Sequence, residues 1–212
     1  MTASTDSRAS PLAGWADRFA AASAEPARFA IREIAFSTQF NLRGNAADPA
    51  FADAASGALG FALPVAANTV SGTAERRALW LGPDEWLLTA PAGEAAAIEA
   101  ALAAALRGVH HALVEVSASR TLIAISGSDA RAVLAKGCAL DLHAGAFGQA
   151  TCAQTLLTKA QVILHCAGPG SSFHLYVRNS FADYLARWLT DAAAESSASQ
   201  ALDAARLAAR LA

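Results

Sequence analysis

The sequence has 212 residues, 54% of them hydrophobic and 16% charged, and a formal net charge of −2. This length is enough for one large domain or for two small ones that share a core. The near-neutral charge and scattered basic residues argue against nucleic acid or an anionic membrane surface as a partner, and no stretch reaches the roughly 18 apolar residues of a membrane span. The charge fraction lies below the roughly 25% typical of soluble domains, which predicts either apolar surface hidden against another protein or a composition inflated by alanine.

An N-terminal arm is expected over residues 1–27, which are rich in Ala, Ser and Asp. Its polar start lacks the apolar core of a secretory signal. Leu12, Trp15 and Phe19 follow one another at spacings of three and four, which predicts a short helix with one apolar side. That side is expected to pack either on its own domain or on a partner.

The first half of the chain then predicts a series of short elements. Residues 28–42 alternate in part between apolar and polar and predict extended chain. A weak helix is expected over residues 51–59, followed by a short strand over residues 61–65. Residues 78–89 predict a hairpin, because a Gly-Pro-Asp-Glu turn separates two apolar stretches. A helix is expected over about residues 93–107, with an apolar stripe every four residues.

The second half predicts the same kinds of element. Strands are expected over residues 113–117, 121–126, 155–157, 162–166 and 173–177. Ser128 is expected to cap a helix over residues 129–136, and Ser180 one with a fully apolar face. Residues 195–212 are expected to be an Ala-rich C-terminal tail. Within it, the Ser-Ser-Ala-Ser stretch after Glu195 predicts a linker, and residues 200–212 predict a marginal helix at best.

Two short matches indicate an internal repeat. Residues 60–64 resemble residues 137–141, and residues 85–89 with the helix that follows resemble residues 173–177 with theirs. The order strand, helix, strand, hairpin, helix therefore occurs twice.

The repeat predicts the fold class. Neither unit could bury its apolar helix face alone, so the expected fold is α+β, with helices packed on antiparallel sheet. We expect a single pseudo-duplicated domain over residues 28–194, with halves of about residues 28–108 and 109–194.

The sequence shows no clear motif for metal, phosphate or nucleophilic chemistry. No histidine pair has the helical i, i+4 spacing of a zinc site, so loop or sheet histidines without a metal are the better interpretation. The three cysteines, Cys138, Cys152 and Cys166, fit neither a disulfide framework nor a CxxC site, and we expect reduced, partly buried thiols in a reducing cytoplasm. The Gly-rich stretch over residues 168–172 lacks the lysine of a phosphate loop and predicts a hairpin turn.

A few residues remain as candidates for a site or an interface. Asp141 lies in an otherwise apolar segment, where a carboxylate must be solvated, paired or used; a turn or cap aspartate is the first interpretation. Trp80 and Trp86 flank a tight turn, as core side chains or as interface anchors. Arg120 is the cation between two apolar strands, either solvated or bonded to backbone carbonyls or to a partner carboxylate. The candidate interface set is Leu12, Trp15, Phe19, Trp80, Trp86 and Arg120.

Several separate strings, in the same order, give the chain a family resemblance. The segment over residues 115–134 resembles the folate-binding T-protein (aminomethyltransferase) superfamily, and its fold is then expected to be like the N-terminal domain of T-protein. The closer likeness is to the gamma-subunit family of heterotetrameric sarcosine oxidase, over roughly residues 10–192. It rests on residues 79–88, 116–121, 137–142, 152–157 and 180–185.

The resemblance implies a non-catalytic gamma subunit of a flavoenzyme complex. That complex demethylates sarcosine oxidatively to glycine, produces hydrogen peroxide and passes the one-carbon unit to tetrahydrofolate. It implies that the chain packs on the alpha subunit, in a heterotetramer with beta and delta. The same resemblance puts FAD, FMN and NAD on the alpha and beta subunits and zinc on delta, and leaves this chain without a cofactor.

The match departs from the superfamily at Asp141. Leu140 precedes it, where the aminomethyltransferases have a polar residue, so the resemblance implies at most a remnant of a folate-type pocket and no catalytic role. The alternative is a stand-alone folate-binding or one-carbon transferase-like protein. An iron–sulfur-cluster maintenance protein on the same fold would need a distinctive cysteine motif, which the sequence lacks.

Overall fold

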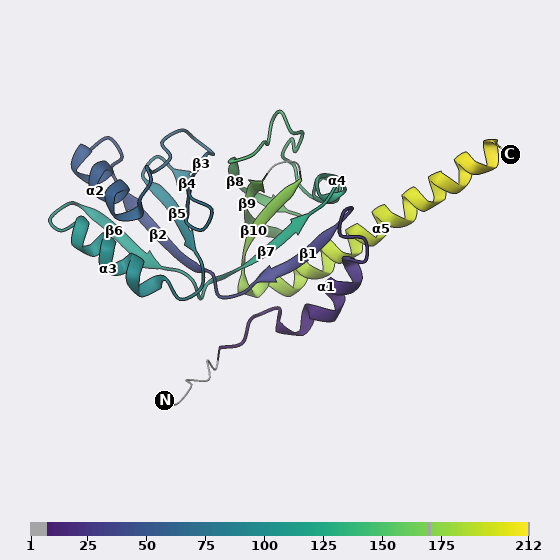
Figure 1. The fold of residues 1–212 in the computed structure, drawn as a ribbon, viewed down its shortest axis with the longest axis horizontal. Coiled ribbons are helices and arrows are strands. Elements are labelled where there is room, and N and C mark those ends of the chain that lie inside the picture. The colour runs from purple at the N-terminus through teal and green to yellow at the C-terminus, as the bar shows by residue number, and fades with distance from the viewer. Residues whose placement is uncertain (1–7, 169–170, 212) are drawn as a thin grey trace.

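Two five-stranded antiparallel sheets form the centre of the molecule, and helices cover their outer faces (Figure 1). The computed structural model describes the backbone of residues 8–168 and 171–211, and side chains as far as residue 195. Across sheet A the strands are β1 (Ala30–Ile34), β7 (Arg120–Ser126), β10 (Ser172–Arg178), β9 (Ala160–Gly168) and β8 (Cys152–Leu157). Across sheet B they are β3 (Val70–Gly72), β4 (Arg77–Gly82), β5 (Glu85–Ala90), β2 (Thr38–Gly44) and β6 (His111–Glu115).

The two halves of the chain exchange their first strands. The strand β1 belongs to the first half but pairs with β7 of the second, with Ile31 opposite Ile125. Conversely, β6 pairs with β2 of the first half, with Leu42 opposite Leu113. Replacing each strand by its counterpart in the other half converts one sheet order into the other. The predicted duplicated α+β fold with antiparallel sheet and packed helices is therefore confirmed.

Each sheet has its own outer core. The helices α2 (Pro49–Leu59) and α3 (Ala95–Ala105) cover sheet B, and Phe51 of α2 stacks on Trp86 of β5 at 5.8 Å between ring centroids. The helices α1 (Ala16–Ala22), α4 (Ala130–Ala135) and α5 (Asn179–Leu211) cover sheet A. Burial of an apolar face on each sheet stabilises these helices, because isolated helices as short as α1 to α4 are marginal in water even when they are rich in alanine.

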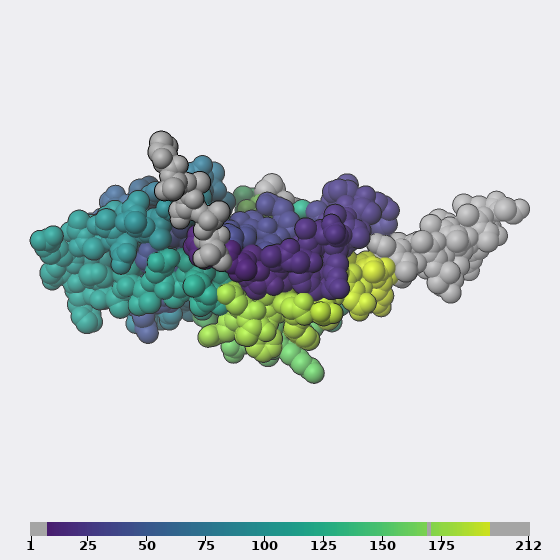
Figure 2. Space-filling view, turned by 90° about the horizontal axis from the view of Figure 1, so that it is seen from below, coloured from purple at the N-terminus to yellow at the C-terminus, as the bar shows by residue number. Residues whose placement is uncertain are grey.

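The N-terminal arm is part of the sheet A core. A 3₁₀ turn at Ala13–Trp15 leads into α1. The indole of Trp15 donates a hydrogen bond to the Asp183 carboxylate of α5 at 3.1 Å. Figure 2 shows the arm (purple) along the side of α5 (yellow-green). Of the two options left open by the sequence, the arm packs on its own domain.

The two sheets contact each other through a thin middle layer. Its buried residues are Leu79, Leu87, Leu122, Cys152, Ile163 and Tyr176. Backbone hydrogen bonds join the sheets at one edge, since Val70 donates to Ala150 at 2.9 Å and Cys152 donates to Asn68 at 2.9 Å. This layer has far fewer apolar residues than either outer core.

Two local expectations are wrong. Residues 61–65 form no strand, because Pro64 has no N–H for a ladder and its carbonyl accepts the indole hydrogen of Trp86 at 2.8 Å. The first strand after α2 is β3 instead. The linker expected after Glu195 is also absent: α5 runs unbroken to Leu211, since alanine, leucine and arginine favour the helix and a few serines cost little. The boundaries of arm, domain and tail stay predictions.

The sheet A core should depend on the inner face of α5. Leu185 is fully buried there, so Leu185→Ala should lower the free energy of unfolding by about 2–5 kcal/mol. Leu156→Ala is the matched control, because that leucine is 53% exposed and should change stability by no more than about 0.5 kcal/mol. Urea denaturation measures both, and equal losses would contradict this account of the core.

Candidate functional site

Four of the six residues expected at an interface lie in the chain's own core. Leu12, Trp15, Phe19 and Trp86 are 2%, 5%, 6% and 0% exposed, which leaves them almost no side-chain surface for a partner. Trp80 and Arg120 are half-buried. An interface role therefore stays a prediction. Trp80 and Arg120 suit it better than the other four residues, because they are more exposed.

Asp141 lies on an exposed turn. Its carboxylate accepts the backbone N–H of His143 at 2.9 Å, which is the side-chain-to-backbone bond of an Asx turn. The loop that follows is held by Arg131, whose guanidinium donates to the carbonyls of Leu142 and Phe147. This geometry agrees with the turn interpretation of Asp141, and a folate-type pocket around it stays a prediction.

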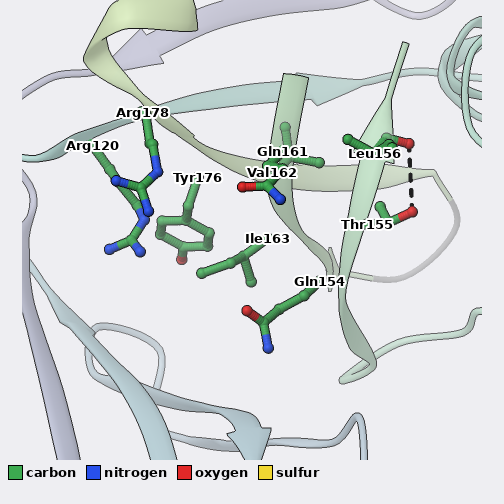
Figure 3. Close-up of a pocket in the computed structure, with 9 residues that line it drawn as sticks. All are labelled: Arg120, Gln154, Thr155, Leu156, Gln161, Val162, Ile163, Tyr176 and Arg178. Atoms are coloured by element: carbon green, nitrogen blue, oxygen red, sulfur yellow. Dashed lines mark hydrogen bonds between the residues drawn. The ribbon is translucent and has the colours of Figure 1, made fainter. Parts of the chain in front are cut away.

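A cleft opens on the face of sheet A that turns toward sheet B (Figure 3). Its volume is about 320 Å³. Alternate residues of a strand point to the same face, so Tyr176 and Arg178 of β10 both project into it. Gln154 of β8 spans the two sheets by donating to the carbonyl of Leu81 at 2.9 Å. The lining residues are Arg120, Gln154, Thr155, Leu156, Gln161, Val162, Ile163, Tyr176 and Arg178.

Two arginines stand side by side at the mouth of this cleft. Arg178 is directly opposite Arg120 in the β7–β10 register, and Figure 3 draws their guanidinium groups close together. Burial lowers the pKa of Arg120, the charge of Arg178 lowers it further, and Glu85 acts weakly in the opposite direction. Within the described residues neither guanidinium has a hydrogen-bond or ion-pair partner. The pair offers donors and no acceptor.

Further along the same layer two histidines face each other. His165 and His174 are opposite in the β9–β10 register, with ring centroids 5.6 Å apart. Burial lowers the pKa of His165 to about 3 and that of His174 to about 4, and the charge of Arg77 adds to both shifts. The Nδ1 atoms of both have no hydrogen-bond partner in the described part of the chain. Both rings are therefore neutral at neutral pH.

The middle layer also contains a buried thiol. Burial raises the pKa of Cys152 to about 11, so the group is protonated and donates to the carbonyls of Trp80 at 3.4 Å and Thr69 at 3.5 Å. All three cysteines are free, as the sequence predicts. Residues 8–168 and 171–195 contain no group of three His, Cys, Asp or Glu side chains that could hold a metal ion.

Comparison with known proteins gives the family. The model of the sarcosine oxidase gamma subunit family matches residues 43–195. The chain belongs to this family. The gamma subunit of sarcosine oxidase from Arthrobacter sp. is 40% identical over 91% of this chain and 93% of its own length.

Two solved structures have a fold similar to that of this chain. A chain of heterotetrameric sarcosine oxidase from Corynebacterium sp. U-96 superposes with a TM-score of 0.82 and 35% identity, over 89% of this chain and 95% of that one. The aminomethyltransferase T from Bartonella henselae superposes with a TM-score of 0.57 and 20% identity, over 81% of this chain and 48% of that one. The second likeness shows the fold alone. No helix in the described part of this gamma-family chain is long and apolar enough to cross a membrane.

Sequence reasoning found Arg120 and missed the rest of the cleft. Arg178 and Tyr176 are separated from Arg120 by more than fifty residues, and only the β7–β10 register brings them together. Within β10, a polar residue alternates with an apolar one from Phe173 to Arg178, and this signal could have placed Arg178 on the inner face. The register itself leaves no such local signal.

The buried histidine pair should make stability depend on pH. An unfolded chain binds protons at these sites below about pH 6.5, whereas the folded chain does so only near pH 4 and 3. The stabilisation is therefore complete above pH 6.5 and is lost as pH falls, by about 1.4 kcal/mol per pH unit and histidine. Urea unfolding between pH 7 and about pH 4.5 measures this slope.

Variants separate this effect from general acid destabilisation. The double variant His165→Gln/His174→Gln should lose most of the slope, whatever its absolute stability. His110→Gln is the control, because His110 is exposed in a loop and should leave the slope unchanged. An unaltered slope in the double variant would show that the two rings do not titrate as proposed.

Proposed function

We propose that this chain is the non-catalytic gamma subunit of a heterotetrameric sarcosine oxidase and that it supports assembly with the alpha subunit. The observation that carries the proposal is its superposition on 95% of a chain of heterotetrameric sarcosine oxidase, at a TM-score of 0.82. The gamma-family match over residues 43–195 supports the same assignment. In this proposal the beta and delta subunits complete the complex, which resides in the cytoplasm.

The reaction of the proposed complex is the oxidative demethylation of sarcosine to glycine, with transfer of the one-carbon unit to tetrahydrofolate. FAD, FMN, NAD and zinc then belong to the other subunits. The described side chains of this chain support a structural contribution: Cys152 is a protonated donor, and Asp141 closes a turn. His165 and His174 are neutral and buried between the sheets.

Exposed apolar side chains support a role in assembly. Leu156 and Val114 are 53% and 54% exposed, and Phe181 is 39% exposed. Large apolar residues at a surface stabilise a complex when a partner removes them from water. Leu156 also lines the cleft that contains the two unpaired arginines, which makes this part of the surface a candidate contact.

Co-expression tests the assembly role. We expect the flavin-bearing subunits to give less assembled, active oxidase when this chain is omitted, and supplying it from a second plasmid should restore the yield. The yield is measured as flavin absorbance and activity of the complex eluting at full size. The destabilised variant Leu185→Ala should restore a lower yield than the control Asp53→Ala, which changes an exposed residue of α2. Assembly at full yield without the chain would contradict the proposal.

The stand-alone folate-binding alternative makes a different prediction. It requires tetrahydrofolate to bind the full chain with micromolar affinity, and Asp141→Ala to abolish that binding. Because the Asp141 carboxylate is exposed and already accepts the His143 amide, we expect calorimetry to show no binding that depends on it. Binding lost in Asp141→Ala but kept in Asp53→Ala, an acidic control on α2, would favour the alternative.

A further inference from the structure

Four arginines each have an acidic partner among the described residues, whereas the neighbouring Arg120 and Arg178 have none. Arg43 contacts Asp84 at 2.7 Å, and Arg76 contacts Glu94 at 2.6 Å. Arg28 with Asp129 and Arg187 with Asp183 follow the same pattern. Arg120 and Arg178 lie next to each other with no such contact among the described residues. The cleft therefore concentrates two positive charges that no acidic side chain contacts in the described part of the chain.

This juxtaposition is unfavourable in the isolated chain. Like charges directly opposite each other on neighbouring antiparallel strands destabilise the sheet, and Arg178 is opposite Arg120 in register. Arg120 is also half-buried, so water screens it only in part. The charge of Glu85 acts on Arg120 in the opposite direction, but this carboxylate already accepts a hydrogen bond from Asn41 at 2.7 Å. Among the residues with described side chains, the arginine pair therefore has no counter-ion in contact with it.

The cleft has the chemistry to accept one. The two guanidinium groups provide planar forks of N–H donors, which suit the two oxygens of a carboxylate. The floor beside them is apolar, since Ile163 and the ring of Tyr176 are buried there, and Leu156 lines the rim. A volume of about 320 Å³ lies at the small end of the range for ligand pockets. The two arginines form one end of the cleft, Ile163 and the Tyr176 ring lie beside them, and the polar Gln154, Thr155 and Gln161 lie with Leu156 toward the other end (Figure 3).

We propose that this inter-sheet cleft binds a carboxylate group between Arg120 and Arg178, with the apolar part of its carrier against Ile163, Tyr176 and Leu156. An inorganic anion could accept hydrogen bonds from both arginines, but it would leave the apolar side chains of the cleft exposed to water. A carboxylate on an apolar carrier would cover them as well. The carboxylate has two sources with the same chemistry: a free small carboxylic acid, or an aspartate or glutamate side chain of the partner subunit. The second source rests on the proposed function, and the first does not.

The first experiment uses the full chain alone with benzoate as probe, at low ionic strength, and measures binding by calorimetry. Benzoate should bind more tightly than inorganic phosphate, and Arg120→Gln or Arg178→Gln should weaken it by about tenfold or more. Arg107→Gln removes the same charge from an exposed turn and should change the affinity by less than about twofold, since that charge is distant and screened. The midpoint of thermal unfolding of both cleft variants should equal or exceed that of the unaltered chain, because each substitution removes a repulsion between like charges. Such a result would exclude misfolding as the cause of weaker binding.

The second experiment uses the assembled complex. If a partner side chain supplies the carboxylate, the double variant Arg120→Gln/Arg178→Gln should dissociate from the complex at a lower salt concentration than the unaltered chain or Arg107→Gln. The subunit ratio after gel filtration measures this dissociation. Assembly of the unaltered chain tests the proposed function separately. Loss of benzoate binding in the cleft variants with unchanged salt resistance of the complex identifies a free ligand, and loss of salt resistance identifies a partner side chain. Benzoate affinity and salt resistance that both ignore the two substitutions would overturn the proposal.

Discussion

The exchange of first strands between the two halves is the constraint on which the rest of the structure depends. To reach the opposite sheet, the chain crosses between the sheets twice, after β1 and after β6. The crossings meet where Gln39 accepts the backbone N–H of Val116 at 2.8 Å and donates its own to Ser117 Oγ at 2.9 Å. Neither sheet is complete with the strands of one half alone. The two halves must therefore form together, although their outer cores are separate.

The same crossing fixes the position of the cleft. Arg120 begins β7 immediately after the crossing segment, and α5 begins just past Arg178, where Asn179 donates to the carbonyl of Ala118 at 2.9 Å. The two arginines thus lie at strand ends that the crossing holds in place. Large outer cores stabilise the molecule on both sides, so the thin layer between the sheets can tolerate an arrangement that costs stability.

The parts of this fold that could be predicted are those encoded by a local period. The apolar face of α5 follows from burial on one side, and the short apolar runs of β9 and β10 follow from burial within the sheet. Each element is where the sequence predicts it. The sequence predicts that Pro64 ends a strand, but its carbonyl accepts the hydrogen bond of the distant Trp86 indole, a tertiary contact that leaves no local pattern. The serines after Glu195 suggest a break, but α5 continues through them to Leu211 because the helix propensity of serine is only modestly unfavourable.

The candidate site was less predictable than the fold, for the same physical reason. Asp141 stood out because a carboxylate in an apolar segment is unusual, and a local Asx turn accounts for it. The pairing of Arg120 with Arg178 depends on which strands become neighbours, and the strand exchange decides that. A residue can be recognised as unusual from its sequence neighbours, whereas its partner across a sheet cannot.

The histidines and the arginines of the middle layer differ in charge state, and this difference follows from their proton affinities. His165 and His174 are buried without a carboxylate and lose their charge, because an imidazole can release its proton well below neutral pH. A guanidinium cannot do so at any physiological pH. Burial lowers the pKa of Arg120 but does not remove its charge. The histidine end of the layer is therefore neutral by itself, and the arginine end requires either water or an anion from outside the chain.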